Sequence, residues 1–140
     1  MEIQYHPAAE KWLAEIATDV ELVEVFGEVM ALITALEKYG RSLEGEETSP
    51  IVSSRFDMHE LRRTPPSTTL PYAEGPPVIR ILYAFCQRQN AGPVAVILLG
   101  GDKADLGEDW YLSNVPVSER RLEEYVRRHD ELKPLGRRST

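Results

Sequence analysis

The stretch PPVIRILYAF, residues 76–85, places a permanent positive charge inside an otherwise apolar segment. Its alternation predicts a β-strand in which Arg80 and Leu82 share one face, while Ile81 and Tyr83 share the other. The second face carries the bulkier side chains and is the better core face. A guanidinium keeps its charge in a protein, and burying it unpaired is costly. We therefore expect Arg80 on the opposite, more open face, beside a carboxylate or an anionic ligand.

The remaining periodicities predict an α+β domain with the element order β-α-α-β-β-β-α. The expected elements are a strand over 2–5, a helix from His6-Pro7, a second helix after a Thr18/Glu21 capping box and ending at Gly40, strands over 55–63, 78–86 and 94–99, and a helix over 118–132. The three later strands are expected to form a small antiparallel sheet. The N-terminal helix pair and the C-terminal helix are expected to pack against it.

The length of 140 residues predicts one domain over residues 1–133, with residues 134–140 as a flexible C-terminal tail. Residues 64–77 contain five of the ten prolines and are expected to form a long surface loop. The single cysteine, Cys86, excludes an intrachain disulfide and is expected to be a small buried hydrophobe. No Cys/His cluster has zinc spacing, so no metal and no cofactor are expected.

The charge distribution restricts the partners that this chain can have. The net charge is −7, which argues against a general nucleic-acid binder, yet residues 61–103 carry 5 Lys or Arg against 2 Asp or Glu. No apolar run approaches the length of a membrane span, and the N-terminus lacks the pattern of a signal peptide. We therefore expect a cytoplasmic protein with no membrane partner, whose anionic ligand binds in the positive segment.

Three cations, Arg62, Arg80 and Lys103, recur at or just beyond consecutive predicted strands. In a meander, all three converge on one sheet face or its rim. The competing interpretation is a set of cross-strand salt bridges, for which Asp57 and Glu60 are available.

Three further side chains also have two interpretations. His59 is either a general base or a structural residue, and the alternation of its strand points it away from Arg62. Trp110 and Tyr111 form either a stacking platform for bases or a contact that holds the last helix to the sheet.

Several short motifs, in this order and spacing, resemble the RelE/ParE toxin superfamily over about residues 3–132. They are HELR at 59–62, RILYAF at 80–85, GGDK at 100–103 and WY at 110–111. The resemblance is strongest to the HigB-like, phage-derived branch. It implies a RelE-like fold and the toxin of a type II toxin–antitoxin module, which cleaves mRNA on the ribosome and is restrained by a helix-turn-helix antitoxin.

The resemblance also implies roles for individual residues. Arg62, Arg80 and Lys103 are the expected catalytic residues, which stabilise charge while a 2′-hydroxyl attacks the adjacent phosphorus. The expected substrate contacts are Arg63, His59 and Tyr111. Two alternatives stay open. One is a catalytically weak or inactive protein of this fold that acts by binding its antitoxin or DNA gyrase, and the other is an unrelated α+β domain whose arginines are all salt-bridged.

Overall fold

The computed structural model describes residues 1–63, 78–104 and 106–136 and arranges them around one mixed sheet. In chain order the elements are β1 (Glu2–Tyr5), α1 (Pro7–Thr18), the 3-10 turn η1 (Val20–Leu22), α2 (Val23–Tyr39), the 3-10 turn η2 (Gly40–Ser42), β2 (Thr48–Pro50), β3 (Met58–Arg62), β4 (Ile79–Arg88), β5 (Val94–Asp102), α3 (Asp109–Arg127) and β6 (Leu132–Pro134). The proline-rich loop predicted over 64–77 lies outside the described residues.

The sheet has the strand order β1-β5-β4-β3-β2, and β6 pairs with the end of β4. The predicted antiparallel meander of β3, β4 and β5 is confirmed by their register. The sheet as a whole is mixed, however, because β1 runs parallel to β5, with Glu2 beside Val94 and Tyr5 beside Ile97. The predicted small antiparallel sheet is therefore one part of a larger mixed sheet. Local alternation marks a strand but carries no information on the direction of its neighbour.

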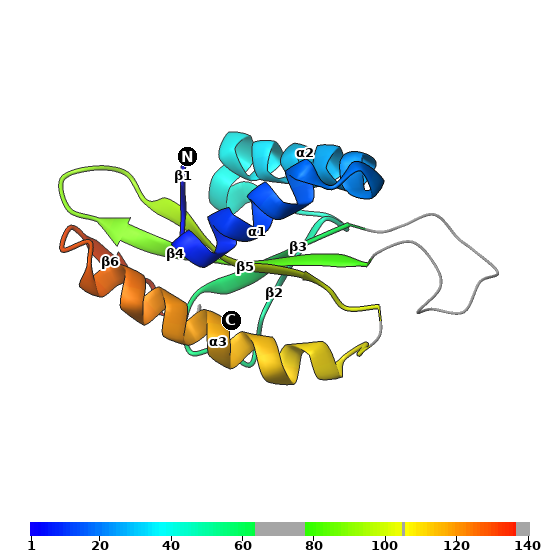
Figure 1. Ribbon diagram of the computed structural model, residues 1–140. Coiled ribbons are helices and arrows are strands. Elements are labelled where there is room, and N and C mark those ends of the chain that lie inside the picture. The colour runs from blue at the N-terminus through cyan, green and yellow to red at the C-terminus, as the bar shows by residue number, and fades with distance from the viewer. Residues whose placement is uncertain (64–77, 105, 137–140) are drawn as a thin grey trace.

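Helices cover both faces of the sheet (Figure 1). On one face α1 and α2 pack on the side chains of Ile79, Ile81, Tyr83 and Phe85. On the other face α3 packs in a second core, whose sheet residues include Leu82, Ala84, Cys86, Val96 and Leu98. The sequence suggested that the face carrying Arg80 is open. The structure shows instead that this face is covered along part of its length. The amphipathic α3 buries much of it and leaves the Arg80 end of the strand beside its own first turn.

The predicted helix boundaries hold at some ends and fail at others. His6 caps α1 by accepting a 3.0 Å hydrogen bond from the Ala8 amide, and Gly40 follows α2 with a φ of 55°, both as predicted. The Thr18/Glu21 capping box was wrong, because the Thr18 hydroxyl donates to carbonyls of its own helix. Asp19 instead accepts a 2.9 Å bond from the Glu21 amide and caps the 3-10 turn that precedes α2.

The last helix begins at Asp109, not near Ser118, and contains Pro116. Proline lacks the N–H that would bond to the carbonyl of Leu112, one turn earlier in the helix. Residues 137–140 of the predicted flexible tail lie outside the described residues. Of the remaining tail residues, Pro134 ends β6 and pairs with Cys86, and Gly136 forms an isolated bridge to Phe56.

Candidate functional site

A cleft of about 380 Å³ opens where β2, β3 and β4 meet the start of α3. Side chains from five segments line it: Ser49, Pro50, Ile51, Val52, Ser53, Glu60, Arg62, Arg80, Lys103, Glu108 and Tyr111. Three of these are the cations that the sequence placed together, and Tyr111 is one of the expected substrate contacts. The predicted shared face is confirmed, because Arg62 and Arg80 are direct partners across the antiparallel β3–β4 pair.

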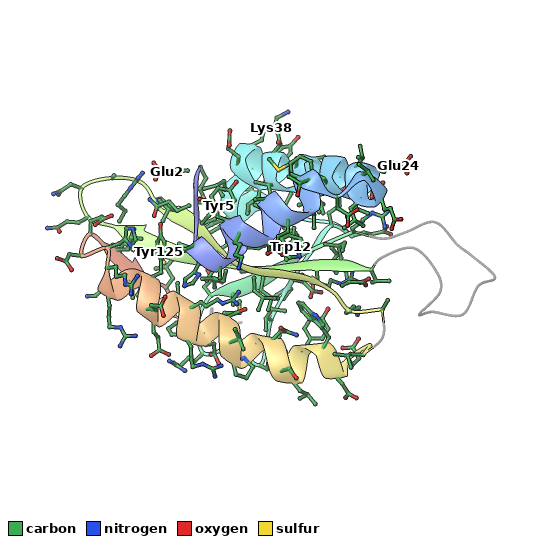
Figure 2. The ribbon with its side chains drawn as sticks, viewed as in Figure 1. Glu2, Tyr5, Trp12, Glu24, Lys38 and Tyr125 are labelled. Carbon is green, nitrogen blue, oxygen red and sulfur yellow. The ribbon has the colours of Figure 1, made fainter. Side chains whose placement is uncertain are left out.

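Two glycines allow the helices to approach this end of the sheet. Gly101 is the β5 partner of Arg80, and a Cβ on it would lie 3.3 Å from the indole of Trp110. The buried Trp110 thus fixes the first turn of α3 against β5, which brings Tyr111 to the cleft. On the opposite face Gly100 contacts Trp12, which Figure 2 shows between α1 and the sheet. The GG pair at the end of β5 therefore helps to position the cleft.

Backbone carbonyls hold the two strand arginines in place. Arg62 donates from Nε and Nη2 to the Glu46 carbonyl, at 3.0 and 2.8 Å. Arg80 donates from Nη1 to the carbonyls of Arg63 and Ile79, at 3.1 and 2.9 Å, and its Nε has no hydrogen-bond partner within the described residues. Neither arginine forms an ion pair with a carboxylate of the described chain. This part of the chain gives no support to the salt-bridge interpretation.

Lys103 lies in a different environment, on the loop between β5 and α3. The residue is 8% exposed, and its Nζ lies 3.5 Å from Glu108 Oε1 and 5.1 Å from the centre of the Tyr111 ring. The Glu108 side chain is 87% exposed, so solvent screens this pair and it restrains Lys103 only weakly. The ring of Tyr111 fixes the position of the ammonium group at the rim of the cleft.

Glu60 also lines the cleft, and the sequence suggested for it only the role of a salt-bridge partner for an arginine. It is 4% exposed, its Oε1 accepts a 3.2 Å bond from Ser49, and its Oε2 has no hydrogen-bond partner among the described residues. Burial and the nearby Glu60 carboxylate raise the pKa of Tyr111, and the opposing effect of Arg80 is smaller. The Tyr111 hydroxyl therefore stays protonated and can donate a hydrogen bond. The sequence signal that could have placed Glu60 in the cleft is the alternation of HELR, which puts Glu60 and Arg62 on one face of the strand.

The other two predicted substrate contacts do not reach this cleft. His59 points to the opposite face, where Nε2 lies 2.8 Å from Asp57 Oδ1 and the ring stacks on Tyr83. Arg63 pairs with Glu28 of α2 and lines a separate groove. The alternation of β3 explains the orientation of His59. Neighbouring residues in a strand face opposite sides, so His59 points away from the face that carries Glu60 and Arg62.

The donor set in the cleft suits the stabilisation of an anion. Cations aimed at developing negative charge lower a barrier without rearranging during the reaction, and a nearby carboxylate with a free oxygen can accept a proton. In the ranges that the structure describes, no group of three or more His, Cys, Asp or Glu residues could hold a metal ion. In the same ranges, no helix is both long and apolar enough to cross a membrane.

Sequence comparison finds a similarity to a protein described as a putative toxin. The chain is 29% identical over 120 residues to the "Putative toxin HigB3" of Mycobacterium tuberculosis (strain ATCC 25618 / H37Rv). The alignment spans 86% of this chain and 89% of that protein. No protein-family model matches the chain, and no solved structure matches it.

Proposed function

We propose that this chain is a HigB-like protein of the RelE superfamily, and that it is the toxin of a type II toxin–antitoxin module that cleaves mRNA on the ribosome. The proposal places it in the cytoplasm with a helix-turn-helix antitoxin as its partner. The observation that carries it is the cleft that unites Arg62, Arg80 and Lys103 with Tyr111.

In the proposed reaction the RNA supplies its own nucleophile. The 2′-oxygen forms a bond to the adjacent phosphorus, the bond from phosphorus to the 5′-oxygen breaks, and the products are a 2′,3′-cyclic phosphate and a 5′-hydroxyl. Negative charge concentrates on the phosphoryl oxygens in the pentacoordinate state. Arg62, Arg80 and Lys103 stabilise that charge, and the loss of one such group costs about 10²–10³ in rate.

Two protons move in this reaction, and the cleft offers a group for each. The 2′-hydroxyl proton passes to Glu60, because its Oε2 is a carboxylate oxygen at the cleft without a hydrogen-bond partner among the described residues. The leaving 5′-oxygen takes a proton from the Lys103 ammonium, which solvent then restores. Tyr111 donates from its protonated hydroxyl to a phosphoryl oxygen, since its raised pKa keeps that proton in place.

The second candidate function is a protein of this fold that acts mainly by binding another protein, either its antitoxin or DNA gyrase. The net charge of −7 and the exposed carboxylate of Glu108 beside Lys103 favour it, because both weaken binding to a polyanion. The two functions differ in their products, because gyrase binding arrests growth but leaves mRNA intact.

Controlled expression of the chain, with and without the protein encoded beside its gene, tests the proposal. We expect growth arrest and cleaved mRNA when the chain is expressed alone, and neither when the neighbour is co-expressed. Growth arrest with intact mRNA would favour gyrase binding instead. Growth that continues without the neighbour would contradict the toxin assignment altogether.

A further inference from the structure

A second groove, of about 340 Å³, shares the lining residue Arg62 with the cleft. We call it the α2 groove, and its lining residues are Glu28, Ala31, Leu32, Ala35, Glu46, Glu47, Arg62 and Arg63. Its apolar lining comes from one face of α2, and its other wall comes from the segment before β2 and the end of β3. The function proposed above makes no use of this groove.

The apolar wall of the groove contains small side chains one helical turn apart, beside Leu32. Ala31 and Ala35 line it, and Gly27 continues the same row one turn earlier. A glycine inside a helix costs about 1 kcal/mol relative to alanine. A Cβ on Gly27 would meet nothing within 4 Å, so packing within the described chain does not require glycine there. A row of small residues allows a second helix to pack at the short end of the usual 8–10 Å separation.

The charges around the groove determine which helix fits. Its lining residues include the acidic Glu28, Glu46 and Glu47, and Arg63 is already paired with Glu28. Neither Glu46 nor Glu47 belongs to an ion pair within the described residues. Carboxylates without partners around an apolar strip are complementary to a helix with a small or apolar face and flanking Lys or Arg side chains.

Arg62 lines both the groove and the cleft, so the two sites share one side chain. The Arg62 guanidinium donates two hydrogen bonds to the Glu46 carbonyl, and its backbone amide donates a 2.8 Å bond to the Glu47 carbonyl. The Glu46–Glu47 segment is therefore both a wall of the groove and the support of Arg62. A helix that contacts Glu46 and Glu47 acts on the same backbone that positions Arg62 in the cleft.

We propose that the α2 groove is the docking site for a basic amphipathic helix of the antitoxin, and that docking changes the position of Arg62 without the helix entering the cleft. The inference rests on the proposed function for the identity of the partner. It assigns that partner a surface outside the catalytic cleft and a route to one of its arginines.

The test uses the full chain and the purified protein encoded beside its gene. Ala31→Arg fills the groove and places a like charge against the basic helix, whereas Thr34→Arg makes the same charge change on an exposed position of α2 outside the groove. Calorimetric titration should show at least tenfold weaker binding for Ala31→Arg and binding within twofold of wild type for Thr34→Arg. Both variants should still arrest growth, because neither residue lines the cleft.

A second measurement follows Arg62 directly. The Nε–H signal of Arg62, assigned by its absence in Arg62→Lys, should shift when the partner binds the wild-type chain. With Ala31→Arg it should stay in place at partner concentrations that saturate the wild type. The proposal would be overturned by an unchanged affinity of Ala31→Arg for the partner, or by an equal loss of affinity for Thr34→Arg. It would also be overturned if the Arg62 signal of the wild-type chain did not shift when the partner binds.

The same experiment separates this inference from the proposed function. If the wild-type chain arrests growth and binds its neighbour, but Ala31→Arg binds equally well, the toxin assignment stands and the docking site is wrong. If the wild-type chain neither arrests growth nor binds the neighbour, the proposed function and the docking site are both wrong.

Discussion

Replacing His59 with alanine tests which face of the sheet carries the chemistry. The His59 side chain is 19% exposed, lies 2.8 Å from Asp57 Oδ1, and contacts the rings of Tyr83 and Phe85 at 5.7 and 5.4 Å between centres. A hydrogen bond to a charged group contributes about 1.5–3 kcal/mol, and each aromatic pair adds roughly 0.5–1.5 kcal/mol. Since solvent partly reaches the ring, we expect His59→Ala to lower the free energy of unfolding by about 3 kcal/mol.

That loss corresponds to a melting temperature lower by roughly 6–12 °C for a domain of this size. Cleavage of mRNA per folded molecule should stay within about twofold of wild type, because His59 faces away from Arg62 and Glu60. The assay combines a melting curve with a cleavage time course below the transition of the variant. A variant that melts like wild type but cleaves tenfold more slowly would refute the reasoning and place substrate on the α1–α2 face.

Three further predictions concern single positions. Gly100→Ala should destabilise the chain by about 1–3 kcal/mol in denaturant titrations, since its Cβ would lie 2.3 Å from Trp12, whereas Gly92→Ala meets nothing within 4 Å and serves as the control. Burial raises the pKa of the Cys86 thiol to about 12, so a thiol reagent at pH 8 should label it only after unfolding; rapid labelling of the folded chain would contradict this. Tyr111→Phe keeps the ring beside Lys103 but removes the hydroxyl, and should slow mRNA cleavage by about 10²-fold with an unchanged melting curve.

The parts of the fold that the sequence predicted are those with a strong local pattern. The alternation of the β4 strand placed Arg80 away from the helix pair and beside Arg62, and the register confirms both. His6-Pro7 and Gly40 marked helix ends because their backbone chemistry acts within one turn. In each case the information lies within a few residues of the feature that it predicts.

The features that the sequence missed depend on distant neighbours. β2 and β6 are three residues long, too short for alternation to distinguish a strand from a loop. The sequence predicted the last helix from near Ser118, whereas α3 begins at Asp109 and includes Pro116. From the sequence, Glu60 was interpreted as a salt-bridge partner for an arginine. Its orientation into the cleft, with Ser49 on one oxygen, follows from the β2–β3 pairing that local reasoning did not include.

The central claim is that the cleft with Arg62, Arg80 and Lys103 cleaves RNA, and Arg80→Ala tests it most directly. The side chain donates to two backbone carbonyls, but its buried Nε has no hydrogen-bond partner within the described residues. Relief of that desolvation offsets much of the loss, so the net cost should be about 1 kcal/mol of stability. We therefore predict a nearly unchanged melting curve together with the disappearance of cleaved mRNA in primer-extension maps, at matched soluble expression. A folded Arg80→Ala variant whose maps match those of wild type would contradict the claim and move the ribonuclease site elsewhere.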